Sequence, residues 1–113
     1  MIDGTAITKA RVDPAFGDEG WLTFYLAGDP SQHAAMKPDL QAMKAVNLSG
    51  AEGGFVYAKI PVKLDESEIT QRVSQVRSLA EKSEIRIDII DLDATADVTT
   101  SNFYTLWTKT RPN

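Results

Sequence analysis

This sequence of 113 residues contains no cysteine and a single histidine, His33. Without cysteine the chain forms no disulfide bond and offers neither a thiolate nucleophile nor a cysteine ligand for zinc or iron–sulfur centres. A zinc site would need further histidines, and a Ser-His-acid triad would need His33 as its base. His33 stands at the start of an expected helix, where a surface position is favoured over a catalytic one.

Long apolar runs and basic blocks are also missing. No run approaches the roughly 18 apolar residues needed to cross a bilayer, and residues 1–5 lack the basic and apolar regions of a signal peptide. The net charge is −4, and the 12 Lys and Arg residues form no basic segment. We therefore expect neither a membrane nor a nucleic acid as partner. The absence of cysteine is compatible with a cytoplasmic location, which we also expect.

The glycines do not form a nucleotide-binding motif. Gly50, Gly53 and Gly54 precede an apolar strand, whereas a phosphate-binding loop requires a strand, then glycines, then a helix. This order excludes both common nucleotide fingerprints. No cofactor is therefore expected.

The clearest pattern in the chain is strand, helix, strand between Phe55 and Leu92. The alternating apolar runs Phe55–Val62 and Ile85–Leu92 predict two strands. Between them, Asp65 and Glu68 have the spacing of a capping box. Apolar residues then recur at helical spacing, which predicts an amphipathic helix over about residues 65–83.

The N-terminal part is expected to form a hairpin. Residues 5–12 are rich in β-branched side chains and predict an edge strand protected by Lys9 and Arg11. Turn-forming residues occupy 13–20, and the aromatic run Trp21–Ala27 predicts a stronger second strand.

Two further segments complete the expected elements. Asp29 followed by Pro30 is typical of a helix start, but Pro38 should kink this helix or divide it into a turn and a later helix. The Thr- and aromatic-rich segment Asn102–Thr110 predicts a fifth strand. A short helix is the alternative there, because its apolar residues also match helical spacing.

These elements predict a single α+β domain over residues 1–113 with the order β-β-α-β-α-β-β. We expect a two-layer sandwich, in which a mixed or antiparallel sheet carries two helices on one face. A ferredoxin-like fold or a dimeric α+β barrel is the specific analogy that this order offers, and such an analogy does not carry function.

The two faces of the expected sheet differ in chemistry. One is aliphatic and can be covered by helices, and the other mixes aromatic and charged side chains. The aliphatic face comprises Leu22, Phe24, Leu26, Val56, Ala58, Ile60, Val62, Ile85, Ile87 and Ile89. The aromatic face comprises Trp21, Thr23, Tyr25, Phe55, Tyr57, Lys59, Arg86, Asp88, Ile90 and Leu92. Unless the C-terminal segment covers it, such a face indicates a partner or ligand surface.

Two functions are compatible with the aromatic face. The first is a non-enzymatic interaction module that forms a homodimer or docks a protein partner, with anchors Trp21, Tyr25, Phe55 and Tyr57. The alternative is a small cofactor-free enzyme or a small-ligand-binding protein with a pocket on the same face. In that case Tyr25, Tyr57, Arg86 and Asp88 would supply its polar groups. No catalytic residue is assigned, because no nucleophile–base pair is recognisable.

Acidic residues accumulate toward and beyond the end of the strand predicted over Ile85–Leu92, at Asp88, Asp91, Asp93 and Asp97. Clustered carboxylates suit Mg²⁺ or Ca²⁺, but the glycine-pivoted loop and the following bidentate Glu of a calcium site are absent. Solvated turn formers are therefore favoured, and no metal site is predicted. For Arg86 and Asp88, an ion pair is favoured over binding of a small anion or carbonyl.

Overall fold

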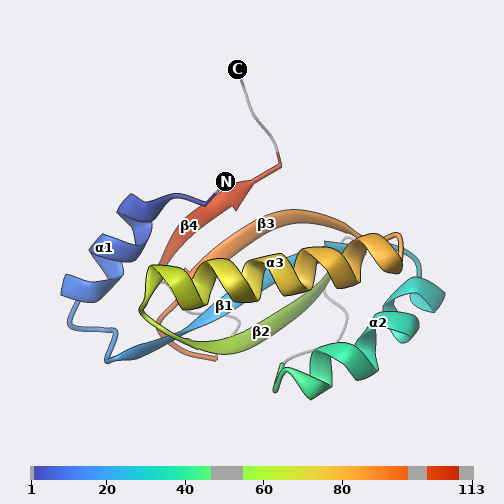
Figure 1. Cartoon of the computed structure of the whole chain (residues 1–113), viewed down its shortest axis with the longest axis horizontal. Helices are drawn as coiled ribbons and strands as arrows, with labels where there is room; N and C mark the ends of the chain where they lie inside the picture. Colours follow the sequence, from blue (N-terminus) through green and yellow to red (C-terminus); the bar gives the residue numbers. More distant parts are fainter. Residues whose placement is uncertain (1, 47–54, 97–101, 110–113) are drawn as a thin grey trace.

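The computed structural model describes residues 2–46, 55–96 and 102–109 (Figure 1). In these residues the chain forms three helices and four strands. In chain order they are α1 (Gly4–Val12), β1 (Glu19–Ala27), α2 (Pro30–Ala42), β2 (Phe55–Lys63), α3 (Glu66–Lys82), β3 (Arg86–Asp93) and β4 (Phe103–Thr108).

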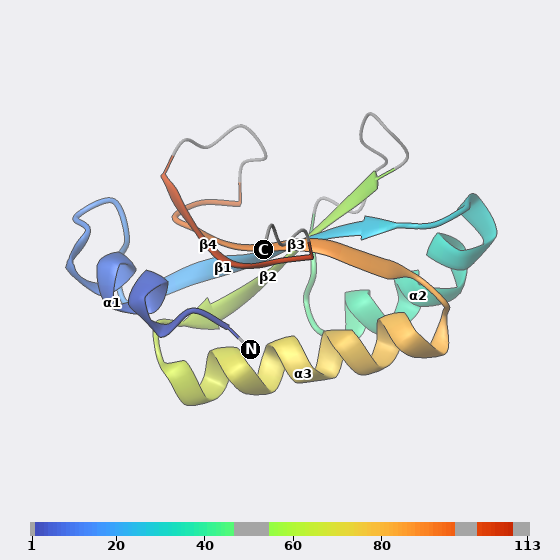
Figure 2. The same cartoon turned by 90° about the horizontal axis from the view of Figure 1, so that it is seen from above.

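The four strands form one antiparallel sheet in the order β2-β1-β3-β4. Figure 2 shows α2 and α3 on the same side of this sheet, while α1 lies beside the end of β4. The expected α+β two-layer arrangement is confirmed. The element order, α-β-α-β-α-β-β, differs from the β-α-β-β-α-β order of a ferredoxin-like fold. In addition, α2 joins two strands, β1 and β2, that are antiparallel neighbours in the sheet.

The first element is a helix, so the expected edge strand over residues 5–12 and its hairpin with β1 are wrong. The Asp3 side chain caps this helix by accepting a hydrogen bond from the Thr5 amide. The helix buries Ala6, Ile7 and Ala10, which share one helical face. Packing of this face outweighs the strand preference of the β-branched residues.

Contacts between distant segments hold α1 and its following turn to β4. The Asp3 amide donates to the Leu106 carbonyl at 2.9 Å. The Tyr104 hydroxyl donates to Asp13 Oδ2 at 2.6 Å, and the Tyr104 ring lies 5.8 Å from that of Phe16. The hairpin prediction depends on the local pattern of residues 5–12, and that pattern gives no sign of these distant contacts.

The start of α2 confirms the predicted helix signature. The Asp29 side chain accepts from the Gln32 amide at 2.9 Å, and the Gln32 side chain accepts from the Asp29 amide at 2.8 Å. The helix continues to Ala42 with Pro38 inside it, so the division into a turn and a later helix is wrong. Met36 and Leu40 are its buried side chains.

Helix α3 confirms the amphipathic helix predicted after β2. Asp65 accepts from the Glu68 amide at 3.0 Å, as a capping residue should. The Glu68 side chain reaches back to the Lys63 amide at 3.0 Å, so the cap extends into the end of β2. The buried residues of α3 face the sheet and are Ile69, Val73, Val76 and Ala80.

A bulge in β3 reverses the expected facing of its second half. Tyr25 pairs with Ile89 and the next residue, Leu26, pairs with Ile87, so Asp88 is extra on β3. Because paired residues share a face, Ile89 lies on the same face as Tyr25 and not in the aliphatic core. Ile90 is fully buried, with 0% of its surface exposed. The expectation that Ile89 faces the core and Ile90 the aromatic face is therefore wrong.

The same shift in register determines the face on which the remaining β3 residues lie. Leu92 is also fully buried, whereas Asp91 pairs with Thr23 and Asp93 with Trp21 on the face opposite the helices. The predicted strand within Asn102–Thr110 is confirmed as β4, and the helical alternative is wrong.

Candidate functional site

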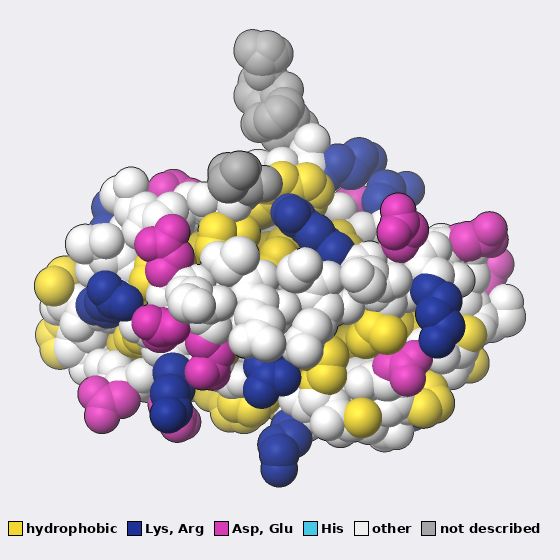
Figure 3. Space-filling model, viewed as in Figure 1, with side chains coloured by type: hydrophobic (Ala, Val, Ile, Leu, Met, Phe, Trp, Pro, Cys, Tyr) yellow, Lys and Arg dark blue, Asp and Glu magenta, His cyan; other side chains and the backbone are white. Residues whose placement is uncertain are grey.

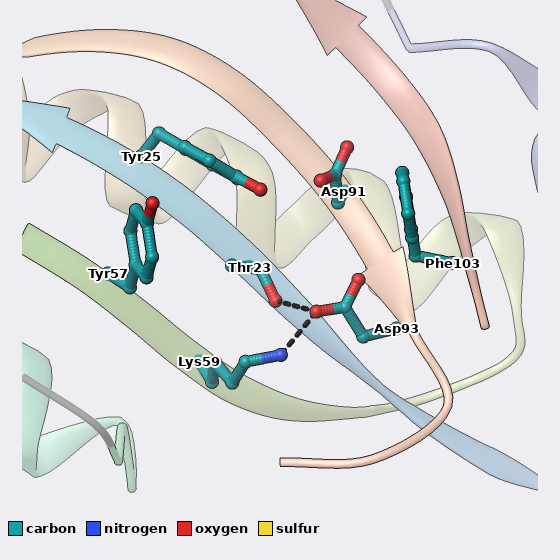
Figure 4. Close-up of a pocket in the computed structure, with 7 residues that line it drawn as sticks. All are labelled: Thr23, Tyr25, Tyr57, Lys59, Asp91, Asp93 and Phe103. Atoms are coloured by element: carbon teal, nitrogen blue, oxygen red, sulfur yellow. Dashed lines mark hydrogen bonds and ion pairs between the residues drawn. The ribbon is translucent and has the colours of Figure 1, made fainter. Parts of the chain in front are cut away.

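A small pocket lies on the sheet face opposite α3 (Figure 4), which we call the open face. Its volume is about 50 Å³, and at about 10–15 Å³ per water it admits a few water-sized groups. All four strands contribute to it. The lining residues are Thr23, Tyr25, Tyr57, Lys59, Asp91, Asp93 and Phe103.

The floor of the pocket contains a buried ion pair. Lys59 is 1% exposed and Asp93 is 5% exposed. Lys59 Nζ pairs with Asp93 Oδ2 and also donates to the Thr95 carbonyl at 3.3 Å. The Thr23 hydroxyl donates to the same Asp93 oxygen at 2.6 Å. One oxygen of Asp93 therefore holds both the ammonium of Lys59 and the hydroxyl of Thr23.

The second oxygen of Asp93 has no such support. Asp93 Oδ1 is buried and has no hydrogen-bond partner among the residues that the structure describes. Figure 4 shows it pointing away from Lys59, toward the space between Asp91 and Phe103. A buried acceptor without a donor is costly, and native proteins rarely retain one without a reason.

A second carboxylate, Asp91, lies beside this oxygen on β3 and is 4% exposed. The Thr105 hydroxyl donates to Asp91 Oδ1 at 2.9 Å, and the Tyr25 hydroxyl points toward Asp91 in Figure 4. Burial raises the pKa of Asp91, with a further increase from the charge of Asp93, while the Thr105 hydrogen bond opposes the rise. Burial and the charge of Asp91 likewise raise the pKa of Tyr25.

Replacing Asp91 with asparagine is expected to stabilise the protein at neutral pH. The amide keeps an oxygen that can accept from Thr105 but carries no charge to desolvate. Because the pKa of Asp91 is raised above its usual 3.8 in the folded protein, the folded state binds this proton more tightly than the unfolded state. The free energy of unfolding of the unaltered protein therefore falls as pH rises from the pKa of Asp91 in the unfolded chain to its higher pKa in the folded protein.

Thermal unfolding of both proteins across this pH range measures the effect. The two Tm values should agree below about pH 3, where the carboxyl is mostly protonated in both states. With rising pH the Asp91→Asn variant should become the more stable by a few degrees. A variant that is less stable at every pH would contradict this account of Asp91.

Aromatic rings also line the pocket. The rings of Tyr25 and Tyr57 come from adjacent strands, with centroids 4.7 Å apart and planes tilted by 54°. Phe103 lines the pocket from β4 and is 47% exposed. A group entering the pocket would therefore meet ring surface as well as carboxylate oxygens.

The structure brings only part of the sequence-predicted site together. Tyr25 and Tyr57 line the pocket, whereas Trp21 is half-buried on β1 and does not. Phe55 pairs with Ala27, and its side chain lies outside the described part of the structure.

Arg86 and Asp88 also stand apart from the pocket lining. They form a surface ion pair with contacts of 2.6 and 3.3 Å, which confirms the predicted interaction between them. The hydrogen bond from Arg86 lowers the pKa of Asp88.

The alternation of β2 predicts the correct face for Lys59, although the predicted site does not include this residue. The prediction that Asp91 and Asp93 are solvated turn formers is wrong, since both are buried. The signal that could have found them is the pair Ile89 and Ile90, because two adjacent apolar residues interrupt the alternation of β3 and indicate a bulge.

Other candidate features contribute nothing to the pocket. The described residues contain no cluster of three or more His, Cys, Asp or Glu suited to a metal ion, and Asp97 lies outside them. His33, for which the sequence predicts a surface position, is half-buried in the first turn of α2. None of the described helices combines the length and apolar character needed to cross a membrane.

Comparisons of this chain with known protein families, with curated proteins and with solved structures found no match. The pocket itself is therefore the basis for a functional assignment.

Proposed function

We propose that this protein binds a small polar ligand in the pocket on the open face of its sheet. One observation carries the proposal: the buried residues Lys59, Asp91 and Asp93 line one pocket together with aromatic rings. Buried charges cost stability, and their concentration in a pocket is typical of functional sites. A pocket wall with few, converging polar groups is also the usual form of a ligand site.

The contacts of Lys59 favour binding over covalent catalysis. Lys59 is the only amine among the described residues that line the pocket. A lysine nucleophile needs a free amine, whereas Lys59 Nζ is engaged by Asp93 Oδ2 and by the Thr95 carbonyl. The arrangement therefore resembles a fixed electrostatic framework more than an activated nucleophile.

Docking of a partner or a second copy on the same face is the second candidate. Phe103 supports it, because this pocket residue is 47% exposed. Of the other exposed large apolar side chains in the described residues, Val12 lies on α1, whereas Val46 pairs with Lys59 at the β2 edge of the sheet. On the side that carries α3, Figure 3 shows acidic and basic side chains interspersed. A docking face usually presents a contiguous apolar patch, whereas the open face holds the buried charged residues Lys59, Asp91 and Asp93 beside Phe103, so ligand binding is supported more strongly.

Titration of ¹⁵N-labelled protein with small probes tests the proposal. Methylammonium chloride, sodium acetate and acetamide represent a cation, an anion and a neutral polar molecule. At least one should shift the amide signals of Thr23, Lys59 and Asp91 in a saturable manner, while signals of α3 stay in place. If no probe shifts them, the proposal is wrong.

The control variants use two exposed apolar residues. Phe103→Ala removes a pocket wall and should weaken the binding of that probe several-fold, while Val12→Ala should leave it unchanged. Light scattering would detect the competing function as a mass near twice 12.4 kDa that Phe103→Ala reduces. The expected cytoplasmic location stays a prediction.

A further inference from the structure

We infer that the group bound in this pocket is a small protonated amine that carries at least one N–H. The inference rests on the proposed function and specifies its ligand class. Its first support is the charge of the pocket. Asp93 and Lys59 form an ion pair, so Asp91 adds a carboxylate that no second cation among the described lining residues balances. A cationic ligand supplies the missing charge.

The second support is the imbalance of hydrogen-bonding groups. Asp93 Oδ1 is an unpartnered acceptor on a residue that is 5% exposed, and it points into the space beside Asp91. The Lys59 ammonium and the Thr23 hydroxyl both donate to the other oxygen of Asp93, and Lys59 also donates to the Thr95 carbonyl. A ligand that brings its own donors, as an ammonium group does, would satisfy Oδ1.

The third support is the aromatic wall. The paired rings of Tyr25 and Tyr57 and the ring of Phe103 line the pocket that holds these carboxylates. Aromatic faces attract cations, most strongly where water is excluded. An anion would instead meet the carboxylates of Asp91 and Asp93, and a neutral amide would leave the charge of Asp91 unbalanced.

The size of the pocket limits the ligand further. A volume of about 50 Å³ accommodates an ammonium group with one or two attached carbons, judged at about 10–15 Å³ per water-sized group. A longer amine could enter only by its end, with the remainder passing the exposed ring of Phe103. Tetramethylammonium has no N–H and is bulkier, so it should bind poorly.

The test is an NMR titration with methylammonium chloride at constant ionic strength, with sodium chloride as the balancing salt. The amide signals of Thr23, Lys59 and Asp91 should shift with a Kd in the roughly millimolar range, as befits so small a ligand. Asp91→Asn should weaken binding by about tenfold or more, because it removes a charged acceptor. Asp88→Asn is the matched control: it removes the same charge from β3 outside the pocket lining and should leave Kd unchanged.

The outcomes separate this inference from the proposed function. Acetate or acetamide binding at the pocket as tightly as methylammonium would overturn the amine assignment and leave ligand binding intact. No shift from any probe at about ten times the expected Kd would overturn both. Equal affinities of the Asp91→Asn and Asp88→Asn variants for methylammonium would also overturn the inference. The ¹⁵N spectrum of each free variant verifies that it is folded.

Discussion

Replacing Asp93 with alanine is expected to lower the free energy of unfolding by about 3–5 kcal/mol, because it leaves a buried charge without its partner. Lys59 is 1% exposed, and Asp93 Oδ2 is the acceptor that holds its ammonium together with the Thr23 hydroxyl. Removing the carboxylate also leaves the Thr23 hydroxyl without this acceptor. Urea unfolding followed by circular dichroism measures the loss as a lower midpoint at an unchanged m-value.

Two further variants test whether the loss of stability comes from the unpaired charge. In the double variant Lys59→Met with Asp93→Leu, neither charge of the pair stays buried, so much of the lost stability should return. Asp88→Ala breaks the surface ion pair with Arg86 and should change stability little, since exposed pairs contribute little. If Asp93→Ala proved as stable as Asp88→Ala, the ion pair under the pocket would have no structural role.

Replacing Ile90 with alanine is expected to cost about 2–5 kcal/mol of stability. Ile90 is 0% exposed and packs in the core opposite Phe24 of β1. The substitution removes buried methyl and methylene groups and leaves a cavity that the surrounding core fills only in part. Denaturant unfolding at equilibrium measures this cost.

The neighbouring residue provides the matched control for the β3 bulge. Ile89 has the same side chain but is half-buried on the open face, so Ile89→Ala should cost clearly less than Ile90→Ala. Regular alternation from Ile85 through Ile87 predicts the opposite ranking. A larger loss at Ile89 would therefore contradict the bulge at Asp88 and the placement of Asp91 in the pocket.

The sequence predicts those elements whose signals are local. The caps at Asp29 and Asp65 fix the starts of α2 and α3, and the alternating run from Phe55 fixes β2. Helix α1 could not be recognised in this way, because its β-branched residues favour a strand locally. Its helical form depends on a partner, β4, that lies far along the chain.

The candidate site, too, is predicted only where the signal in the sequence is local. Simple alternation on β1 and β2 places Tyr25, Tyr57 and Lys59 on one face, as the structure does. Alternation fails on β3, because one inserted residue exchanges the two faces of everything that follows. For this reason the sequence directs attention to Arg86 and Asp88, and the acidic residues of the pocket are missed.

The attachment of α1 to β4 also has a consequence for how the chain folds. A helix of 9 residues is marginal on its own, and the contacts that hold it join Asp3 to Leu106 and Asp13 to Tyr104. To form these contacts the chain must close a long loop, and this closure costs conformational entropy before the contacts can repay it. During synthesis the first helix emerges long before its partner strand, so this corner of the molecule can consolidate only after β4 has been made and paired with β3.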